Sequence, residues 1–154
     1  SEYSLWSRDA EAEVMPTCAE LGVSFIAFSP LGRGFLTGSV TGPDDFVGDD
    51  RRTTMPRFEA DNLRKNVELL RPIEAMAAAK GCTPAQVAMS WVLGSDEPVI
   101  PIPGAKSRHH LEDNALALDI AFDAAEREAL TRAFPLGVAA GARFDDRQIR
   151  QINL

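Results

Sequence analysis

The sequence predicts an α/β protein in which parallel strands alternate with helices. The apolar run at 23–28, interrupted only by Ser24 and bounded by Gly22 and Pro30, is typical of a parallel strand buried on both faces. Helical spacing of apolar residues precedes this run, and two capping boxes farther along the chain start further helices. Three strands are expected in all. Because three strands with one helical layer do not close, we expect this chain to be part of a larger fold.

Composition excludes several classes of protein. The 154 residues are 45% hydrophobic and 25% charged, as in ordinary globular proteins. A net charge of −7 argues against general binding to nucleic acid or to an anionic membrane. No apolar run approaches the roughly 20 residues of a membrane-spanning helix. Cys18 and Cys82 lack disulfide-framework or zinc-site spacing, so a cytoplasmic location with two small buried thiols is expected.

The first thirty residues are expected to form a βαβ unit. A short strand at 3–5 comes first, followed by a helix over 11–21 and the strand at 23–28. Gly22 ends the helix, because glycine adopts the left-handed conformation there without penalty. The inward face of the helix is expected to hold Val14, Cys18 and Leu21.

A long irregular stretch at 29–60 follows the second strand. It is rich in glycine and proline, and it contains an acidic patch formed by Asp44, Asp45, Asp49 and Asp50. Loops of this length inside a compact domain are uncommon and are often lids or binding loops. The alternative is a disordered insertion after Gly38.

Helices dominate the rest of the chain. A helix over 62–80 is expected to end at Gly81 and to bury Leu63, Val67, Leu70, Ile73 and Met76. Capping boxes at 83–86 and 123–126 begin two more helices, the second of which runs to about 133. Between them we expect a strand at 98–103 and a helix from Ser107 to about 115, with Leu111 and Ala115 facing inward. The tail from Pro135 is expected to be a loop with a short helical turn.

The first segment with chemical potential is 28–38 (FSPLGRGFLTG), at the carboxyl end of the strand at 23–28. Its glycines allow an anion to approach the backbone N–H groups, and Arg33 offers a fork of donors suited to phosphate. Phe28 can stack on a flat ring. The alternative is a glycine-rich turn with a solvated arginine.

The second such segment is 101–114, which links the last strand to a helix. Lys106, Ser107 and Arg108 stand at the start of that helix, where an anion is stabilised, so they form a candidate phosphate site. The alternative is a solvated helix end. His109 and His110 are adjacent, so they point in different directions and predict no metal site. Trp6 and Trp91 are expected to be packing residues.

Together the two segments resemble the aldo-keto reductase family. The matching stretches are 28–38, 102–107 (IPGAKS), 111–114 (LEDN), 2–8 (EYSLWSR) and 139–144 (AAGARF). This resemblance implies a (β/α)8 TIM barrel that reduces an aldehyde or ketone to an alcohol with NADPH. Residues 1–154 would supply the C-terminal part of one barrel domain, roughly strands six to eight, and the N-terminal half would be absent.

The resemblance also implies a binding site for NADP(H). Phe28 would stack on the nicotinamide, and the pyrophosphate loop would contain Ser29, Leu31, Gly32, Arg33 and Gly34. The adenosine 2′-phosphate would be surrounded by Gly104, Lys106, Ser107, Arg108 and His110. Asp113 and Asn114 would contact the adenine. The catalytic tetrad would lie outside this chain, and Tyr3 matches the sixth strand rather than the catalytic tyrosine, so no catalytic residue is expected here.

The isolated 154 residues are therefore expected to be inactive, although the intact protein would take a small-molecule carbonyl as its substrate. Two alternatives stay open. One is a non-catalytic nucleotide-binding or regulatory half-barrel, which would cover its strand edge by self-association or with a complementing N-terminal half. The other is an inactive fragment. Neither nucleic acid nor a membrane is an expected partner.

Overall fold

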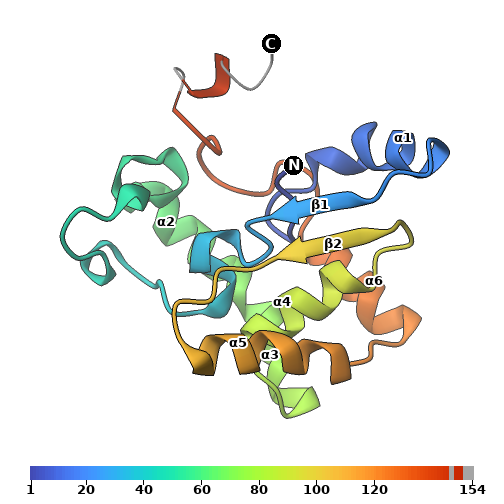
Figure 1. Cartoon of the computed structure of the whole chain (residues 1–154). Helices are drawn as coiled ribbons and strands as arrows, with labels where there is room; N and C mark the ends of the chain where they lie inside the picture. The colour runs from blue at the N-terminus through green and yellow to red at the C-terminus, as the bar shows by residue number, and fades with distance from the viewer. Residues whose placement is uncertain (146–147, 151–154) are drawn as a thin grey trace.

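A parallel pair of strands organises the chain, whose computed structural model describes residues 1–145 and 148–150. Strands β1 (Phe25–Phe28) and β2 (Val99–Ile102) pair in parallel, with Phe25 opposite Val99 and Phe28 opposite Ile102 (Figure 1). The N-terminal segment lies along the other edge of β1. The Tyr3 N–H donates to the Phe28 carbonyl at 3.3 Å, and the Phe28 N–H donates to the Ser1 carbonyl at 3.0 Å. The predicted parallel order is therefore confirmed.

The strand predicted at 3–5 is replaced by isolated bridges. Glu2 forms an isolated parallel bridge to Phe28, and Ser4 and Ser7 form an isolated antiparallel bridge with two backbone hydrogen bonds of 3.1 Å. This turn folds the chain back on itself, so Leu5 cannot extend the ladder along β1.

The helices are α1 (Val14–Glu20), α2 (Ala60–Val67), α3 (Arg71–Lys80), α4 (Pro84–Leu93), α5 (Arg108–Leu116) and α6 (Ala124–Ala133). Short 3-10 helices join them: η1 (Asp9–Glu11), η2 (Gly32–Thr37), η3 (Pro43–Asp45), η4 (Arg51–Thr54), η5 (Pro56–Phe58), η6 (Glu68–Leu70) and η7 (Ala117–Asp119). Both capping boxes are confirmed, since Thr83 and Gln86, and likewise Asp123 and Glu126, exchange side-chain-to-backbone hydrogen bonds. Among the described residues, no helix has the length and apolarity needed to cross a membrane.

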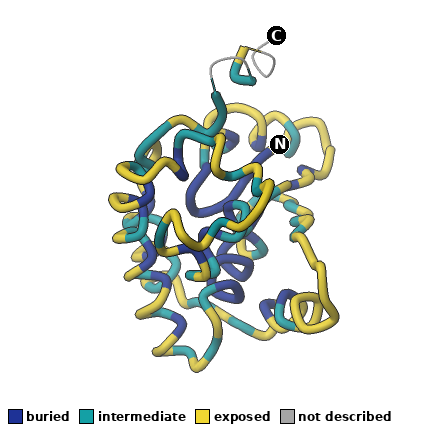
Figure 2. The backbone as a smooth tube through the Cα atoms, turned by 90° about the vertical axis from the view of Figure 1, so that its left-hand side faces the viewer, coloured by how far each residue is buried: buried dark blue, intermediate teal, exposed yellow. Residues whose placement is uncertain are grey.

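Helix α4 forms the centre of the packing. It contacts β2, α3 and α5, and it buries Val87, Ala88, Trp91 and Val92. In Figure 1, α1 lies above the edge of β1, and α3 to α6 lie below β2. The buried parts of the backbone run through the middle of the molecule, while the exposed ones form its outer turns (Figure 2). Both tryptophans are buried, as predicted.

The expectation that the strand at 23–28 is buried on both faces is wrong. Phe25 and Ala27 are buried toward the helices, but Ile26 is 54% and Phe28 is 37% exposed. Ile100 and Ile102 of β2 are about half exposed in the same way. In the described part of the chain the helices therefore cover one face of the strands, and the other face presents a row of apolar side chains.

Three helix predictions also need correction. The helix expected at 62–80 is divided into α2, η6 and α3, because Pro72 lacks the N–H that a continuous helix needs. In α1 the buried side chain is Met15, whereas Val14 and Leu21 are exposed. In α5, Leu111 and Ala115 were expected to face inward, but both are exposed. The helix instead packs inward on the side that contains Asn114.

The tail from Pro135 is a docked loop. The Asn66 side chain, which is buried, donates to the carbonyls of Arg57 and Ala140 at 3.0 Å and accepts from the Ala140 N–H at 2.8 Å. The predicted helical turn is visible at 148–150, and the remainder of that prediction lies outside the described residues. One amide thus holds the tail against α2 and η5.

Candidate functional site

A groove of about 1310 Å³ opens at the carboxyl ends of β1 and β2. Phe28 and Ile102, the last residues of the two strands, both line it. Four segments complete its walls: the glycine loop (29–38), the lid segment (39–54), the start of α4, and the connection from β2 into α5. Ligands of parallel α/β proteins bind at this end of the strands, because the loops that follow the strands meet there.

The glycine loop owes its shape to left-handed backbone at successive positions. Gly32, Arg33 and Gly34 have φ values of 58°, 58° and 87°. A Cβ at Gly34 would lie 3.3 Å from Nη1 of Arg52, so glycine also leaves room for the lid segment. Phe35 is fully buried and stacks on Trp6 with ring centroids 4.1 Å apart, which ties the loop to the core.

The Arg33 guanidinium is engaged inside the protein, although the residue lines the groove. Its Nη1 and Nη2 donate to the two carboxylate oxygens of Glu2 at 3.1 and 2.8 Å. The sequence suggested that this guanidinium faces a phosphate. In the structure the guanidinium instead binds the carboxylate of Glu2, a residue of the same chain.

The second segment brings part of its predicted phosphate site to the groove. Lys106 and His110 line it. The Ser107 hydroxyl accepts from the His110 N–H at 3.1 Å and so caps α5. Arg108 lies outside the lining and pairs with Glu112 at 2.7 Å, and its side chain is 89% exposed. The spacing of four residues between Arg108 and Glu112 on one helix was a signal for this pair.

The predicted adenine contacts lie beside the start of α4. Asp113 accepts from Nε2 of Gln86 at 2.8 Å and from the Thr83 hydroxyl at 3.3 Å. The Asn114 side chain donates to the Gly104 carbonyl at 3.4 Å. These bonds hold the start of α4 next to α5, and the capping residue Thr83 thereby becomes part of the groove wall.

Most of the predicted site residues come together in this groove. Its lining includes Phe28, Ser29, Leu31, Arg33, Gly34, Gly104, Lys106, His110, Asp113 and Asn114. Gly32, Ser107 and Arg108 lie outside it. Residues that the sequence interpretation missed include Thr83, Pro84, Ala85, Ile102, His109 and, in the lid segment, Val47, Arg51 and Arg52. Ile102 and His109 lie within the segment at 101–114, whereas the start of α4 and the lid segment reach the groove only through the fold.

The lid segment is ordered by its own polar contacts. Oδ2 of Asp45 accepts from the backbone N–H groups of Thr41 and Gly42 at 2.7 and 2.9 Å. Asp50 binds the Arg52 guanidinium, with 2.6 Å between Oδ2 and Nη2. Nη1 of Arg52 in turn donates to the Arg33 carbonyl at 3.0 Å, which joins the lid segment to the glycine loop.

Replacing Asp50 by asparagine is expected to loosen the contact between the lid segment and the glycine loop. Hydrogen bonds from Arg52 hold the pKa of Asp50 at about 2, below its usual value of 3.8. The stabilising contribution is therefore complete above pH 3.8 and is lost as the pH falls toward 2. At neutral pH, Asp50→Asn should raise the rate of tryptic cleavage after Arg51 and Arg52 by about three- to tenfold. Asp44→Asn, at an exposed position of the same segment, is the control. Equal cleavage rates in the two variants would show that the Asp50–Arg52 pair does not hold the lid segment to the glycine loop.

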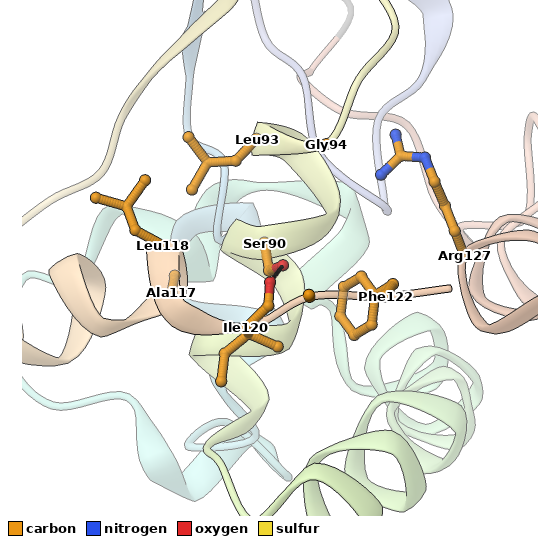
Figure 3. A pocket seen from close by; sticks show the side chains of 9 residues that line it. Ser90, Leu93, Gly94, Ala117, Leu118, Ile120, Phe122 and Arg127 are labelled. Carbon is orange, nitrogen blue, oxygen red and sulfur yellow. Dashed lines mark hydrogen bonds between the residues drawn. The ribbon is translucent and has the colours of Figure 1, made fainter. Parts of the chain in front are cut away.

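A second, smaller pocket of about 390 Å³ lies at the opposite end of α4 (Figure 3). It is lined by Ser90, Leu93, Gly94, Ala117, Leu118, Ile120, Ala121, Phe122 and Arg127. Its polar groups serve the fold, since the Ser90 hydroxyl donates to the Ile120 carbonyl at 2.6 Å and Arg127 donates to the Trp91 carbonyl at 2.8 Å. The groove, where polar side chains and strand ends meet, is the stronger candidate.

The described residues give little support to metal binding or to proton transfer by Tyr3. These residues contain no group of three or more His, Cys, Asp or Glu side chains placed to hold a metal ion. Tyr3 is buried against Phe25 and Trp91, and its hydroxyl donates to Glu11 at 2.9 Å. Burial raises the pKa of Tyr3, and this residue lies outside the lining of the groove.

A family model and a curated relative both match this chain to aldo/keto reductases. A family model described as "Aldo/keto reductase family" matches residues 1–134. A protein named "Probable aldo-keto reductase 1" from Glycine max is 39% identical over 143 residues, which are 93% of this chain and 41% of that protein. The chain thus spans about two fifths of the length of this relative.

Solved structures give the same result. A glycerol dehydrogenase from Gluconobacter oxydans is 25% identical with a TM-score of 0.77, over 86% of this chain and 40% of that one. An aldo/keto reductase from Klebsiella pneumoniae, solved in complex with NADP and acetate, is 28% identical with a TM-score of 0.60, over 94% of this chain and 41% of its own.

Proposed function

The chain belongs to the aldo/keto reductase family, and from that premise we propose that residues 1–154 supply the NADP(H)-binding part of a (β/α)8 barrel that reduces an aldehyde or ketone. The related Klebsiella pneumoniae enzyme was solved with NADP, which supports this choice of cofactor. NADPH supplies the hydride in such a reduction, and the residues of this chain bind and orient it.

One observation carries the proposal. A single groove contains an aromatic ring at the end of β1 and a cation after the end of β2. Phe28 offers a flat, partly exposed surface suited to a nicotinamide ring, and Lys106 offers a positive charge suited to a phosphate. A dinucleotide has an aromatic ring at each end and phosphates between and beside them, so it matches this distribution of groups.

The other groove residues fit the same ligand. Backbone freedom at Gly34 lets a pyrophosphate approach the glycine loop closely. His110 lies near Lys106 in the wall and offers a further donor for the 2′-phosphate. Asp113 and Asn114 present acceptor and donor groups suited to adenine, and the bonds from Gln86 and Thr83 orient the Asp113 carboxylate.

The proton donor for the carbonyl oxygen is proposed to lie outside these residues. The sequence contains one tyrosine, Tyr3, whose hydroxyl is bonded to Glu11 away from the groove. We therefore propose that residues 1–154 alone bind the cofactor without turning over a carbonyl.

Replacing Lys106 by alanine tests the cofactor assignment. Because its ammonium would face the 2′-phosphate, Lys106→Ala should raise the Kd for NADPH by about tenfold or more. The Kd for NADH, which lacks that phosphate, should change by about twofold or less. Titration of the fluorescence of each reduced cofactor measures both constants.

Arg108→Ala is the matched control. Arg108 is also a cation at the start of α5, but it pairs with Glu112 outside the groove lining. Its replacement should leave both dissociation constants nearly unchanged. Equal losses of NADPH and NADH affinity in Lys106→Ala would remove the 2′-phosphate assignment.

A further inference from the structure

Arg33 has a left-handed backbone conformation, which is unfavourable for most residues other than glycine. With φ 58° and ψ 33° it lies in the left-handed region, between two glycines that also have positive φ. The Cβ of an ordinary residue crowds the following carbonyl there, so the surroundings must hold the conformation in place. The glycine loop depends on this, because Arg33 stands at its centre.

The contact that holds Arg33 is a buried ion pair with Glu2. The guanidinium and the carboxylate meet through two hydrogen bonds of 3.1 and 2.8 Å, and the Glu2 side chain is 1% exposed. The Ser7 hydroxyl donates to the same carboxylate at 3.0 Å and fixes its orientation. A paired geometry of this kind fixes direction as well as distance, which a single hydrogen bond does not.

Arg33 also contacts both the lid segment and the tail. Arg52 of the lid segment donates to its carbonyl at 3.0 Å, and the Phe144 ring of the tail lies 4.8 Å from its guanidinium carbon. Arg143 approaches Glu2 to 4.0 Å. A change in the Arg33 backbone would therefore move the glycine loop and its contact with the lid segment together.

We propose that Glu2 is a positioning residue of the cofactor site, which acts through Arg33 to hold the glycine loop in its left-handed shape. Arg33 then supports the loop from within and is not the ligand of the pyrophosphate. This inference rests on the proposed function, because it concerns the same groove. It adds a role for Glu2, which lies outside the lining of the groove and is separated from Arg33 by 31 positions in the chain.

Glu2→Gln tests this role in the natural polypeptide that carries these 154 residues. Loss of the ion pair should raise the Kd values for NADPH and NADH by the same factor, about tenfold, because both cofactors share the pyrophosphate. The double variant Glu2→Gln with Arg33→Gly should bind both cofactors within about threefold of the unchanged protein, since glycine adopts the left-handed conformation without the pair.

The double variant separates positioning from direct binding. If Arg33 is itself the pyrophosphate ligand, its replacement by glycine deepens the loss caused by Glu2→Gln, and the inference is overturned. Arg143→Gln is the control, because it removes a guanidinium beside the same carboxylate without touching the loop. Its cofactor affinities should not change.

Amide hydrogen exchange gives a readout that does not depend on the cofactor. Exchange in the glycine loop should be faster in Glu2→Gln and return to its original rate in the double variant. If Glu2→Gln does not fold, Arg33→Lys replaces it, since lysine keeps the charge and loses the paired geometry. Unchanged exchange would overturn the inference. An unchanged protein that binds neither cofactor would instead refute the proposed function.

Discussion

Replacing Phe35 by alanine is expected to lower the free energy of unfolding by about 3–5 kcal/mol. Phe35 is fully buried in the core cluster and stacks on Trp6, with an angle of 24° between the ring planes. Trp6 also contacts Phe58 edge-on, at 5.6 Å between centroids, so the cavity would open within an aromatic group that cannot easily collapse.

Denaturant unfolding followed by circular dichroism measures this loss. Phe46→Ala is the matched control, because Phe46 belongs to the lid segment and is only half-buried against the core, so its removal should cost about 1–2 kcal/mol. Since Phe35 also ties the glycine loop to the core, NADPH affinity should fall in Phe35→Ala. A loss of less than about 1 kcal/mol would show that the loop is not held by this stacking.

Replacing Gly141 by alanine is expected to cost about 2–4 kcal/mol and to displace the tail. The residue has φ +83°, and a Cβ there would lie 2.6 Å from the Pro56 carbonyl oxygen and 2.7 Å from Nδ2 of Asn62. The tail must therefore move away from η5. Its neighbour Ala140 would then lose its hydrogen bonds with Asn66, of 2.8 and 3.0 Å.

Gly137→Ala distinguishes the cost of a left-handed backbone from the cost of a steric clash. Gly137 belongs to the same tail and has a similar φ of +74°, but a Cβ there would meet nothing within 4 Å. Its replacement should cost only the left-handed penalty, about 1–2 kcal/mol. Thermal unfolding of the two variants measures the difference, and equal losses would contradict the packing of the tail against η5.

Residues three or four positions apart were sufficient to predict where several helices begin and end. The capping boxes at 83–86 and 123–126 begin helices as expected, and Gly22 and Gly81 end theirs with positive φ. These features depend on residues three or four positions apart, so the sequence contains all the information they need. The candidate loops were also identifiable, because each follows a strand and contains glycines or cations.

The faces of the elements and the partners of the charged side chains depended on distant contacts. The run at 23–28 looks buried on both faces, yet the described helices cover one. Arg33 looks free to bind phosphate, but the fold brings Glu2 from the neighbouring strand edge onto its guanidinium. Arg52 reaches the glycine loop across 19 positions of sequence. A cap is satisfied by its own turn, whereas a guanidinium is satisfied by whichever carboxylate or carbonyl the folded chain places beside it.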